Sequence, residues 1–336
     1  MVKRIIIFPI MIALALAALF NAAAFAAAYP DKNINGIIMW GAGGVMDRVA
    51  RSVAPTAEKE LGKSIIMQNK TGASGAIATT YVKNAKPDGY NLLFGAENPN
   101  IYKVMGLSNI DYDDFEPIFI FMSTIATVCV NNDSPYKTYT DLINDAKKRK
   151  LRLGSTGPGG LPYLATSMIR SVHKGIDFNL VQFDGEGPAL TALMGNHIDA
   201  FPVSMVSAME LIKGGKIRAL AVFDVKRNPS LKEVPTVIEE FKEFKQYLPW
   251  GAFYGVFVRK DTPKDIQSTL RTAFKKAYDD PKFRDFANSM GGVLVGLTGE
   301  PAKKYIAHNK SVSAWLMQQA GAAKKSPAEF GIPKPK

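Results

Sequence analysis

The fold class is decided by the stretch Ile34-Asn35-Gly36-Ile37-Ile38-Met39-Trp40-Gly41-Ala42-Gly43-Gly44-Val45-Met46-Asp47. Its apolar first half, Ile34–Trp40, predicts a β-strand, and Gly41–Gly44 predicts a tight turn. A helix is predicted next, because apolar residues recur at every fourth position: Val45, Val49, Val53, Ala57 and Leu61. A strand, a glycine turn and a helix in this order are typical of an α/β fold with parallel strands.

The same alternation of strands and helices continues along the chain. Further strands are predicted over Ser64–Gln68, Tyr90–Phe94, Thr127–Val130, Leu151–Leu153, Asn179–Phe183, Ile198–Val203, Ile217–Phe223 and Phe253–Val258. Helices are predicted over Ser74–Ala85, Tyr139–Lys148, Leu161–Ser171, Pro188–Met194, Val206–Lys213, Lys264–Tyr278, Pro281–Met290 and Pro301–Ala320. Gly62 stands where a helix C-cap is expected. The tail, residues 324–336, is predicted to be low in order.

The length of the chain exceeds one ordinary domain, and the two series of strands and helices predict two lobes. We expect residues 29–131 and 250–336 to form lobe 1, and residues 132–249 to form lobe 2. The chain would then cross between the lobes twice, near Asn131-Asn132 and near Pro249-Trp250. Two crossing strands form a hinge that permits closure around a ligand.

Residues 1–28 predict a cleavable secretory signal peptide, and therefore a periplasmic protein. Lys3 and Arg4 precede the apolar run Ile5–Phe20, and the small-residue stretch Ala22–Ala28 predicts cleavage after Ala28. An uncleaved membrane anchor is the alternative, since this segment has nearly the length that spans a bilayer. Cleavage removes two positive charges, Lys3 and Arg4, so the formal net charge would fall from +12 to +10.

The composition excludes several other classes of protein. The lysine and arginine residues are scattered and accompany no nucleic-acid-binding motif, so no nucleic-acid partner is expected. The single cysteine, Cys129, can form no internal disulfide and is expected to be a small buried core residue. No metal-ligand spacing is present, and no metal or cofactor is expected.

A second glycine-rich loop, Gly154-Ser155-Thr156-Gly157-Pro158-Gly159-Gly160, precedes the helix predicted over Leu161–Ser171. Each loop taken alone is equally consistent with a plain tight turn. Both loops, however, follow predicted strands, and ligands of α/β sheets bind at the carboxyl ends of the strands. Glycines let the backbone approach a ligand, and the N–H groups of a helix start favour an anion. A nucleotide site is disfavoured, because the third glycine of a dinucleotide fingerprint and the Gly-Lys-Ser/Thr of a Walker loop are missing.

Catalysis finds little support in the sequence, and the chain is expected not to be an enzyme. A Gly-x-Ser-x-Gly elbow is absent, since Gly72-Ala73-Ser74-Gly75 has the wrong spacing. The three histidines, His173, His197 and His308, are expected at the surface or at helix ends. A hydrolase that uses Ser155 as its nucleophile is a distant alternative.

Several short motifs, taken together in order and spacing, resemble the substrate-binding receptors of tripartite tricarboxylate transporters, also called the Bug family. The resemblance extends from Tyr29 to about Ala320. The motifs that carry it are Ala42-Gly43-Gly44 with Asp47, Asn69–Gly75, Pro87-Asp88-Gly89-Tyr90, Gly154-Ser155-Thr156-Gly157, Pro188-Ala189-Leu190, Gly214–Ala221 and Val234-Pro235-Thr236.

The resemblance implies a type II periplasmic binding protein fold and delivery of a small organic acid to a membrane permease. It also implies a pocket in which the two glycine loops hold a carboxylate through backbone N–H groups and bridging waters. The residues that match these positions are Ala42, Gly43, Gly44 and Asp47 in lobe 1, and Ser155, Thr156 and Gly157 in lobe 2. Asp184 and Ser204, which follow two strands of lobe 2, would complete the pocket wall. We expect a monomer.

The departures from the family pattern bear on the ligand. Trp40 stands where a proline-rich stretch is usual, and it would either stack on a planar ligand or pack at the hinge. Glu97, Asp184 and Glu186 stand near the mouth of the expected pocket. Three carboxylates would repel a polycarboxylate such as citrate. The ligand is therefore expected to carry an amino, amide or hydroxyl group beside its acid, or to be less anionic than a tricarboxylate. The alternative, that these acids cap helix starts, stays open.

The sequence leaves two partners open. The leading interpretation is a transport receptor that docks on a permease of the tripartite tricarboxylate type. A ligand sensor that docks on a membrane signalling partner would need the same cleft.

Overall fold

The structure is a computed structural model that describes residues 29–183 and 185–335. The predicted signal peptide, residues 1–28, and the predicted pocket residue Asp184 lie outside the described residues. Among the described residues, none of the helices combines the length and the apolar character needed to cross a membrane.

Lobe 1 is built on a six-stranded sheet with the order β11-β4-β10-β3-β1-β2. The parallel strands are β1 (Ile34–Ile38), β2 (Ile65–Asn69) and β3 (Asn91–Gly95). The antiparallel strand β10 (Ala252–Arg259) lies between β3 and β4 (Phe115–Thr124), and β11 (Val293–Leu297) forms the edge.

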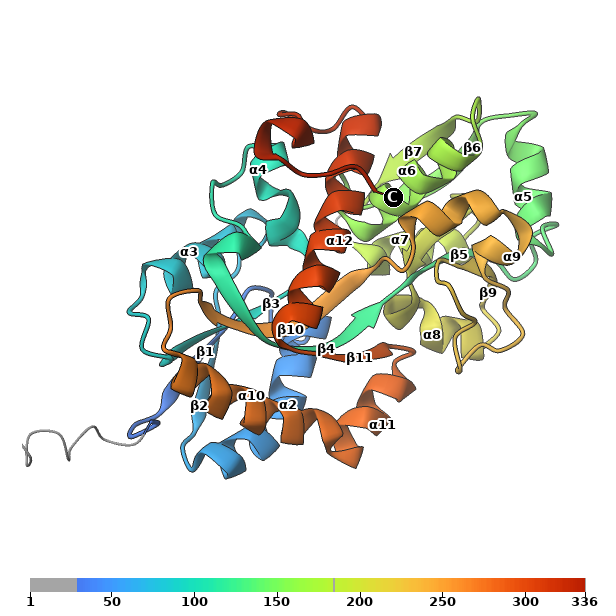
Figure 1. Ribbon diagram of the computed structural model, residues 1–336. Helices are drawn as coiled ribbons and strands as arrows, with labels where there is room; N and C mark the ends of the chain where they lie inside the picture. Colours follow the sequence, from blue (N-terminus) through green and yellow to red (C-terminus); the bar gives the residue numbers. More distant parts are fainter. Residues whose placement is uncertain (1–28, 184, 336) are drawn as a thin grey trace, which may run out of the picture.

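The helices of lobe 1 cover both faces of this sheet. Figure 1 shows α2 (Val45–Leu61), α10 (Lys264–Asp279) and α11 (Pro281–Ser289) on one side. The helices α3 (Ala76–Asn84), α4 (Tyr102–Met105) and α12 (Gly299–Gln319) lie on the other side. Gly62 is the left-handed C-cap of α2, as predicted, and its N–H donates to Glu58 O at 2.8 Å.

Lobe 2 repeats the strand order of lobe 1. Its strand β5 (Ala126–Asn131) lies between β8 (Phe201–Ser204) and β9 (Ile217–Val222), antiparallel to both. The parallel pair β6 (Leu151–Ser155) and β7 (Phe178–Gln182) joins β8 through a bridge between Leu153 and Ala200. The helices of this lobe are α5 (Tyr139–Ala146), α6 (Leu161–Val172), α7 (Glu186–Met194), α8 (Met205–Lys213) and the short α9 (Val237–Glu240).

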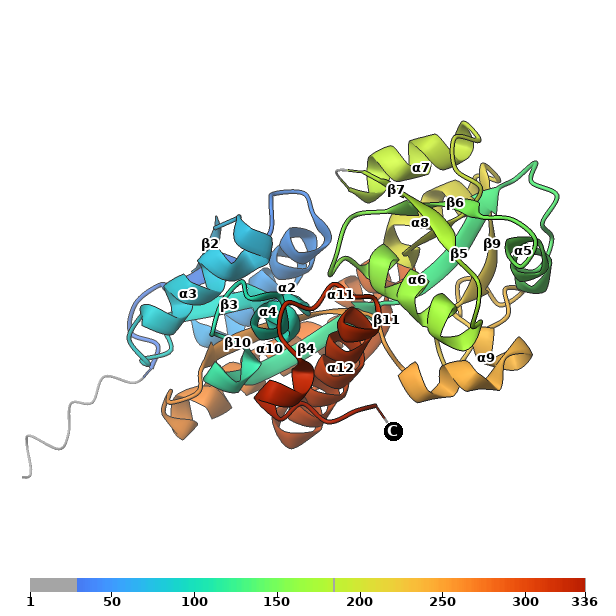
Figure 2. The same cartoon turned by 90° about the horizontal axis from the view of Figure 1, so that it is seen from above.

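The two sheets therefore correspond strand by strand, as β2-β1-β3-β10-β4 and β7-β6-β8-β5-β9. In each sheet one antiparallel strand stands directly beside a crossing between the lobes. The two-lobed α/β fold predicted from the sequence is confirmed, and Figure 2 shows the lobes side by side with β11 and α12 at their boundary.

The first crossing lies earlier in the chain than predicted. The sequence placed it near Asn131-Asn132, but Ala126–Asn131 already pairs with β8 and β9 in the second sheet. The crossing is at Ile125, directly after β4, and the second runs through Trp250 and Gly251 into β10. The two crossings touch, because a Cβ added at Gly251 would lie 2.1 Å from Thr124 O.

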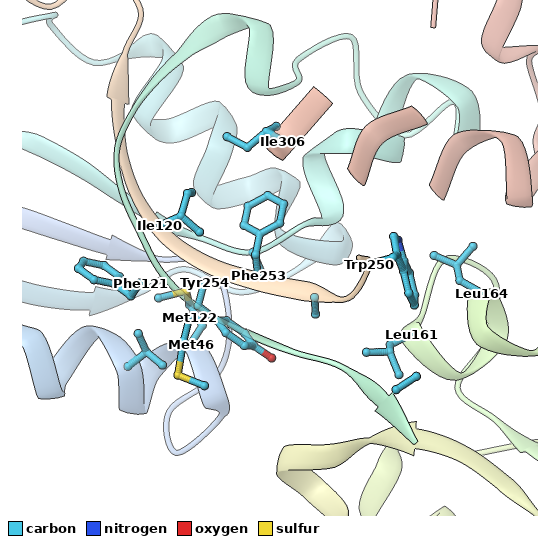
Figure 3. Packing of buried hydrophobic residues seen from close by; sticks show 14 of the residues in the cluster. Met46, Ile120, Phe121, Met122, Leu161, Leu164, Trp250, Phe253, Tyr254 and Ile306 are labelled. Atoms are coloured by element: carbon cyan, nitrogen blue, oxygen red, sulfur yellow. The ribbon is translucent and has the colours of Figure 1, made fainter. Parts of the chain in front are cut away.

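Apolar packing is continuous across the hinge. Trp250 is buried beside Leu161 and Leu164 of α6, as Figure 3 shows, and its Nε1 donates to Ser313 Oγ of α12 at 2.9 Å. Cys129 is a buried free cysteine, as predicted.

The prediction of low order in the C-terminal tail is wrong. Residues Pro327–Phe330 form a short 3-10 helix, and Ile332 is buried against Ile101, Val104 and Ala314. The indole Nε1 of Trp315 donates to Ile332 O at 3.1 Å. The prediction relied on the polar composition of the tail and overlooked the single isoleucine, Ile332, that packs into the core. Figure 1 shows the tail lying over α4 and α12.

Candidate functional site

The first glycine loop, Gly41–Gly44, is exposed and leads into α2. Gly44 is the N-cap, with extended backbone and no side-chain cap. Gly43 has a φ of +78°, which favours glycine, and Gly44 N donates to Gly41 O at 3.2 Å. Since the first N–H groups of a helix have no intrahelical acceptor, the start of α2 can hold an anion.

Asp47 fixes this loop from within. Its Oδ2 accepts from Gly43 N at 2.9 Å, and its Oδ1 accepts from Arg51 Nε and Asn69 Nδ2, each at 2.9 Å. Burial opposes ionisation of Asp47, but these hydrogen bonds outweigh it and hold the pKa of the carboxyl below its usual value. Both oxygens of Asp47 are therefore engaged inside lobe 1, and the residue positions the loop.

The second glycine loop has the corresponding place in lobe 2. Gly160 is the N-cap of α6 without a side-chain cap, and Pro162 removes one donor from the first turn. Ser155 is buried, and its Oγ accepts from Gly157 N at 3.3 Å. Thr156 is partly exposed.

A cavity of about 210 Å³ between the lobes is lined by the second glycine loop and by Trp40, which directly precedes the first. The predicted site residues Ala42, Gly43 and Gly44 are not among its lining residues. Trp40 lines it from lobe 1, and Thr156 and Gly159 line it from lobe 2. The lobes are in contact beside it, since a Cβ at Gly159 would lie 2.9 Å from Ile101 Cδ1 of lobe 1. The structure thus brings Trp40 and Thr156, from different lobes, to the same cavity.

Glu97 follows β3 and stands at the start of the 3-10 helix Asn98–Ile101, but its side chain does not cap that helix. Its Oε2 is buried and has no hydrogen-bond partner. Burial, with a smaller contribution from the charge of Glu186, raises the pKa of Glu97 to about 7. Glu97 is not among the residues that line the cavity, but the next residue, Asn98, is, and its buried Oδ1 is unpartnered. Sequence reasoning did not single out Asn98, although it directly follows Glu97.

Glu186 behaves differently, because its carboxylate is already used. It accepts from Ser204 N at 3.0 Å and from Ser204 Oγ at 2.5 Å. Ser204 in turn caps α8 by accepting from Ser207 N at 3.3 Å. Glu186 is the first residue of α7, which has no side-chain cap, and its carboxylate instead binds the N-cap residue of α8. Glu97 caps no helix start.

The histidines form no catalytic set with these residues. His197 is exposed, and His173 is the C-cap of α6, but it is buried against Phe241 and Phe244. The prediction is wrong for His308, which lies inside α12 and is half-buried. Within residues 29–183 and 185–335, no three His, Cys, Asp or Glu side chains are grouped as metal ligands.

Two α/β lobes, a two-strand hinge and facing glycine loops define a solute-binding receptor of the Venus-flytrap type. The family model "Tripartite tricarboxylate transporter family receptor" matches residues 49–321. The chain belongs to this family of periplasmic binding receptors.

Individual relatives agree with this assignment. A UPF0065 protein of Agrobacterium vitis, from the TAR-I ttuE-ttuC' intergenic region, is 32% identical over 279 residues, which are 80% of this chain and 77% of the relative. The structure of a TctC solute-binding protein from Polaromonas is 30% identical with a TM-score of 0.75, covering 87% of this chain and 99% of that one. The periplasmic binding protein BugD is 28% identical with a TM-score of 0.74, covering 88% and 100%. These structures confirm the type II fold.

Two Rhodopseudomonas palustris proteins, one with adipate and one with bound malate, share the fold at 24% identity. Their TM-scores are 0.73 and 0.67, and each alignment covers 88% of this chain and 99% of the other.

Proposed function

We propose that this chain is exported by residues 1–28 and captures a small organic acid between its lobes for a membrane permease of the tripartite tricarboxylate type. One observation carries the proposal: Trp40, in the segment that precedes α2, and Thr156, in the loop that precedes α6, come from different lobes and line the same cavity. Both helices start at glycine N-caps without side-chain caps, which leaves their N–H groups available to a carboxylate.

Binding without turnover fits the same residues. Ser155, the candidate nucleophile, is buried and accepts a hydrogen bond from Gly157 N. A serine nucleophile needs a base within hydrogen-bond reach, and none of the three histidines is engaged with Ser155. The site is therefore suited to hold a ligand unchanged.

Native mass spectrometry of the purified protein, followed by calorimetry, tests the proposal. We expect a co-purified organic acid, or micromolar binding (about −8 kcal/mol) of an acid from a panel that includes malate, adipate, citrate and amino acids. NMR should recover the bound acid unchanged after prolonged incubation. Failure of every acid to bind, or its conversion to product, would refute the proposal.

A hydroxyl in the second loop provides a variant test. Thr156→Val keeps the size of the side chain and removes its hydroxyl, so affinity should fall about fivefold. Thr272→Val, on the exposed face of α10, is the matched control and should bind like the wild type. Equal affinity of all three proteins would exclude a contact between the Thr156 hydroxyl and the ligand.

A further inference from the structure

Two neighbouring acceptor atoms have no donor, and one of them belongs to Asn98, which lines the interlobe cavity. The Oε2 atom of Glu97 and the Oδ1 atom of Asn98 are buried, and neither accepts a hydrogen bond. Buried polar atoms in native proteins are nearly always paired, because an unpaired one has lost its water without compensation. Two such atoms on adjacent residues, one of which lines the cavity, indicate that a donor arrives with the ligand.

The protein itself offers no cation to these acceptors. The residues that line the cavity besides Asn98 are aromatic, aliphatic, hydroxyl-bearing or glycine, without a lysine or arginine among the described ones: Trp40, Ser74, Ile101, Tyr102, Met105, Leu107, Thr156, Pro158, Gly159 and Gly160. The titratable groups that interact with Glu97 are phenols on several elements and one acid: Tyr102 on α4, Tyr112, Tyr254 on β10, Tyr305 on α12 and Glu186 on α7.

A second acid, Glu186, makes ionisation of Glu97 less favourable. The charge of Glu186, from lobe 2, contributes to the raised pKa of Glu97, and the hydrogen bonds of Glu186 come from the neutral groups of Ser204. The charges of both carboxylates act on the phenol of Tyr254. Figure 3 shows the ring of Tyr254 beside Met46 and Met122, with its hydroxyl directed away from Phe121. An ionised Glu97 would therefore stand near a like charge with no basic neighbour.

We propose that the ligand carries a protonated amine beside its carboxylate, and that Glu97 and Asn98 accept hydrogen bonds from this ammonium group. This inference rests on the proposed function, since the carboxylate would occupy the glycine loops. An ammonium group has three donors and a positive charge, so it satisfies both acceptors and offsets the charges of both acids. A hydroxyl would satisfy one oxygen and leave the charge, and a second carboxylate would add repulsion.

The proposal predicts a proton linkage of defined sign. Burial and Glu186 hold the pKa of free Glu97 near 7, whereas a bound ammonium stabilises the ionised form. Binding at pH 5–7 therefore releases a proton, and affinity should rise with pH by up to about tenfold per pH unit until it levels above pH 7. A dicarboxylate that needs neutral Glu97 would show the opposite slope.

Calorimetry with acids matched in length tests the ligand class. The pairs are 4-aminobutanoate with glutarate and 5-aminopentanoate with adipate. Alanine, aspartate, glutamate and the corresponding amine-free acids complete the panel, and all are measured at pH 5.5 and 7.5. Any acid recovered by native mass spectrometry is added. We expect amine-bearing acids to bind at least tenfold more tightly than their partners and to release a proton on binding. Preference for amine-free acids would overturn this inference and leave the proposed function intact, whereas binding of no acid would overturn both.

Glu97→Gln tests the residue, because it removes the charge and keeps the shape. We expect it to weaken an amine-bearing ligand by about 10- to 100-fold, to abolish the pH dependence, and to leave amine-free acids unchanged or tighter. Glu233→Gln makes the same change at an exposed position of lobe 2 and should alter nothing. Asn98→Ala should lower the affinity for an amine-bearing ligand by a smaller factor, about fivefold. Wild-type affinity and pH slope in Glu97→Gln would refute the role of Glu97, and the wild-type pH slope decides the matter if the variants misfold.

Discussion

At the scale of single residues, Asp47 shows how one side chain prepares a ligand loop without needing to touch the ligand. Its two oxygens join the turn at Gly43, the helix at Arg51 and the end of β2 at Asn69. Asp47→Asn turns one acceptor into a donor that opposes these N–H groups. Urea unfolding should show a loss of about 1–3 kcal/mol. Asp285→Asn, at an exposed position of α11, is the control and should stay near wild-type stability.

His173 is a second residue with a measurable effect, because its burial lowers the stability of the folded state at acid pH. Its ring packs 4.5 Å from the ring of Phe241, and its Nε2 lies 3.2 Å from Tyr139 Oη. Burial, helped by the charge of Lys147, lowers the pKa of His173 to about 4. The unfolded chain takes up this proton near pH 6.5, so the folded state loses up to about 1.4 kcal/mol per pH unit as pH falls from 6.5 towards 4.

Urea titrations between pH 7 and 4.5 measure this contribution. His173→Gln should have a shallower acid slope than the wild type, while His197→Gln, at an exposed site, should keep the full slope. Identical slopes in all three proteins would mean that His173 is protonated in the folded state at its usual pKa.

At the scale of elements, contact with lobe 1 fixes the position of the loop before α6. Gly159 has a φ of +85°, and an added Cβ would lie 2.9 Å from Ile101 Cδ1 and 3.2 Å from Met105 Sδ. These side-chain ends can shift, so Gly159→Ala should fold, losing about 1–2 kcal/mol to its backbone. Because the loop must move away from lobe 1, ligand affinity should fall as well.

The matched control for this variant is Gly175→Ala. Gly175 has a φ of +87° and open space around its Cβ position, so it carries the same backbone cost without the contact between lobes. Calorimetry should find weaker binding only in Gly159→Ala. Equal affinities would show that closure at this loop does not contribute to binding.

Sequence reasoning found most of the elements because their signals are local. The glycine turns and apolar runs located α2 and β6, and the corresponding segments agree within a few residues. It missed β4, in which only Ile118–Met122 is continuously apolar, and β11, and it misplaced the first crossing. Which sheet Ala126–Asn131 joins depends on pairing with strands up to 94 residues away, as in Thr127 Oγ1 to Ala221 O, and no local pattern encodes that choice.

The candidate site divides in the same way. Position at a strand end was enough to draw attention to Glu97 and Glu186, because the carboxyl ends of strands meet at one edge. It could not distinguish them, since Glu186 is paired with Ser204, which lies 18 residues further along the chain. The unpaired Oδ1 of Asn98 is likewise a property of the packed structure. The contact of Asp184 with a ligand stays a prediction.

At the scale of the whole molecule, the lobes are held together at the hinge and on both sides of it. Ser171 Oγ of lobe 2 donates to Gln319 Oε1 of α12 at 2.7 Å, and Asn228 Nδ2 donates to Gly291 O at 3.3 Å. Asn309 of α12 anchors the second crossing by donating to Gly251 O at 2.8 Å. Opening of the lobes must therefore break polar contacts far from the cavity. These contacts favour the closed state, and a ligand that bridges both loops would stabilise it further.

The contact between the two crossings is most easily tested at Gly251, because a side chain there would clash with a backbone atom that cannot rotate away. A Cβ would stand 2.1 Å from Thr124 O, and no rotamer relieves that clash, so Gly251→Ala must separate the two crossings. We expect a loss of about 1–3 kcal/mol in urea unfolding, and a smaller ligand-induced decrease in radius of gyration by X-ray scattering. Gly187→Ala, in α7 with open space around its Cβ, should keep wild-type compaction. Wild-type stability and compaction in Gly251→Ala would show that the crossings move apart freely, and that the contacts of α6 and α12 alone set the angle between the lobes.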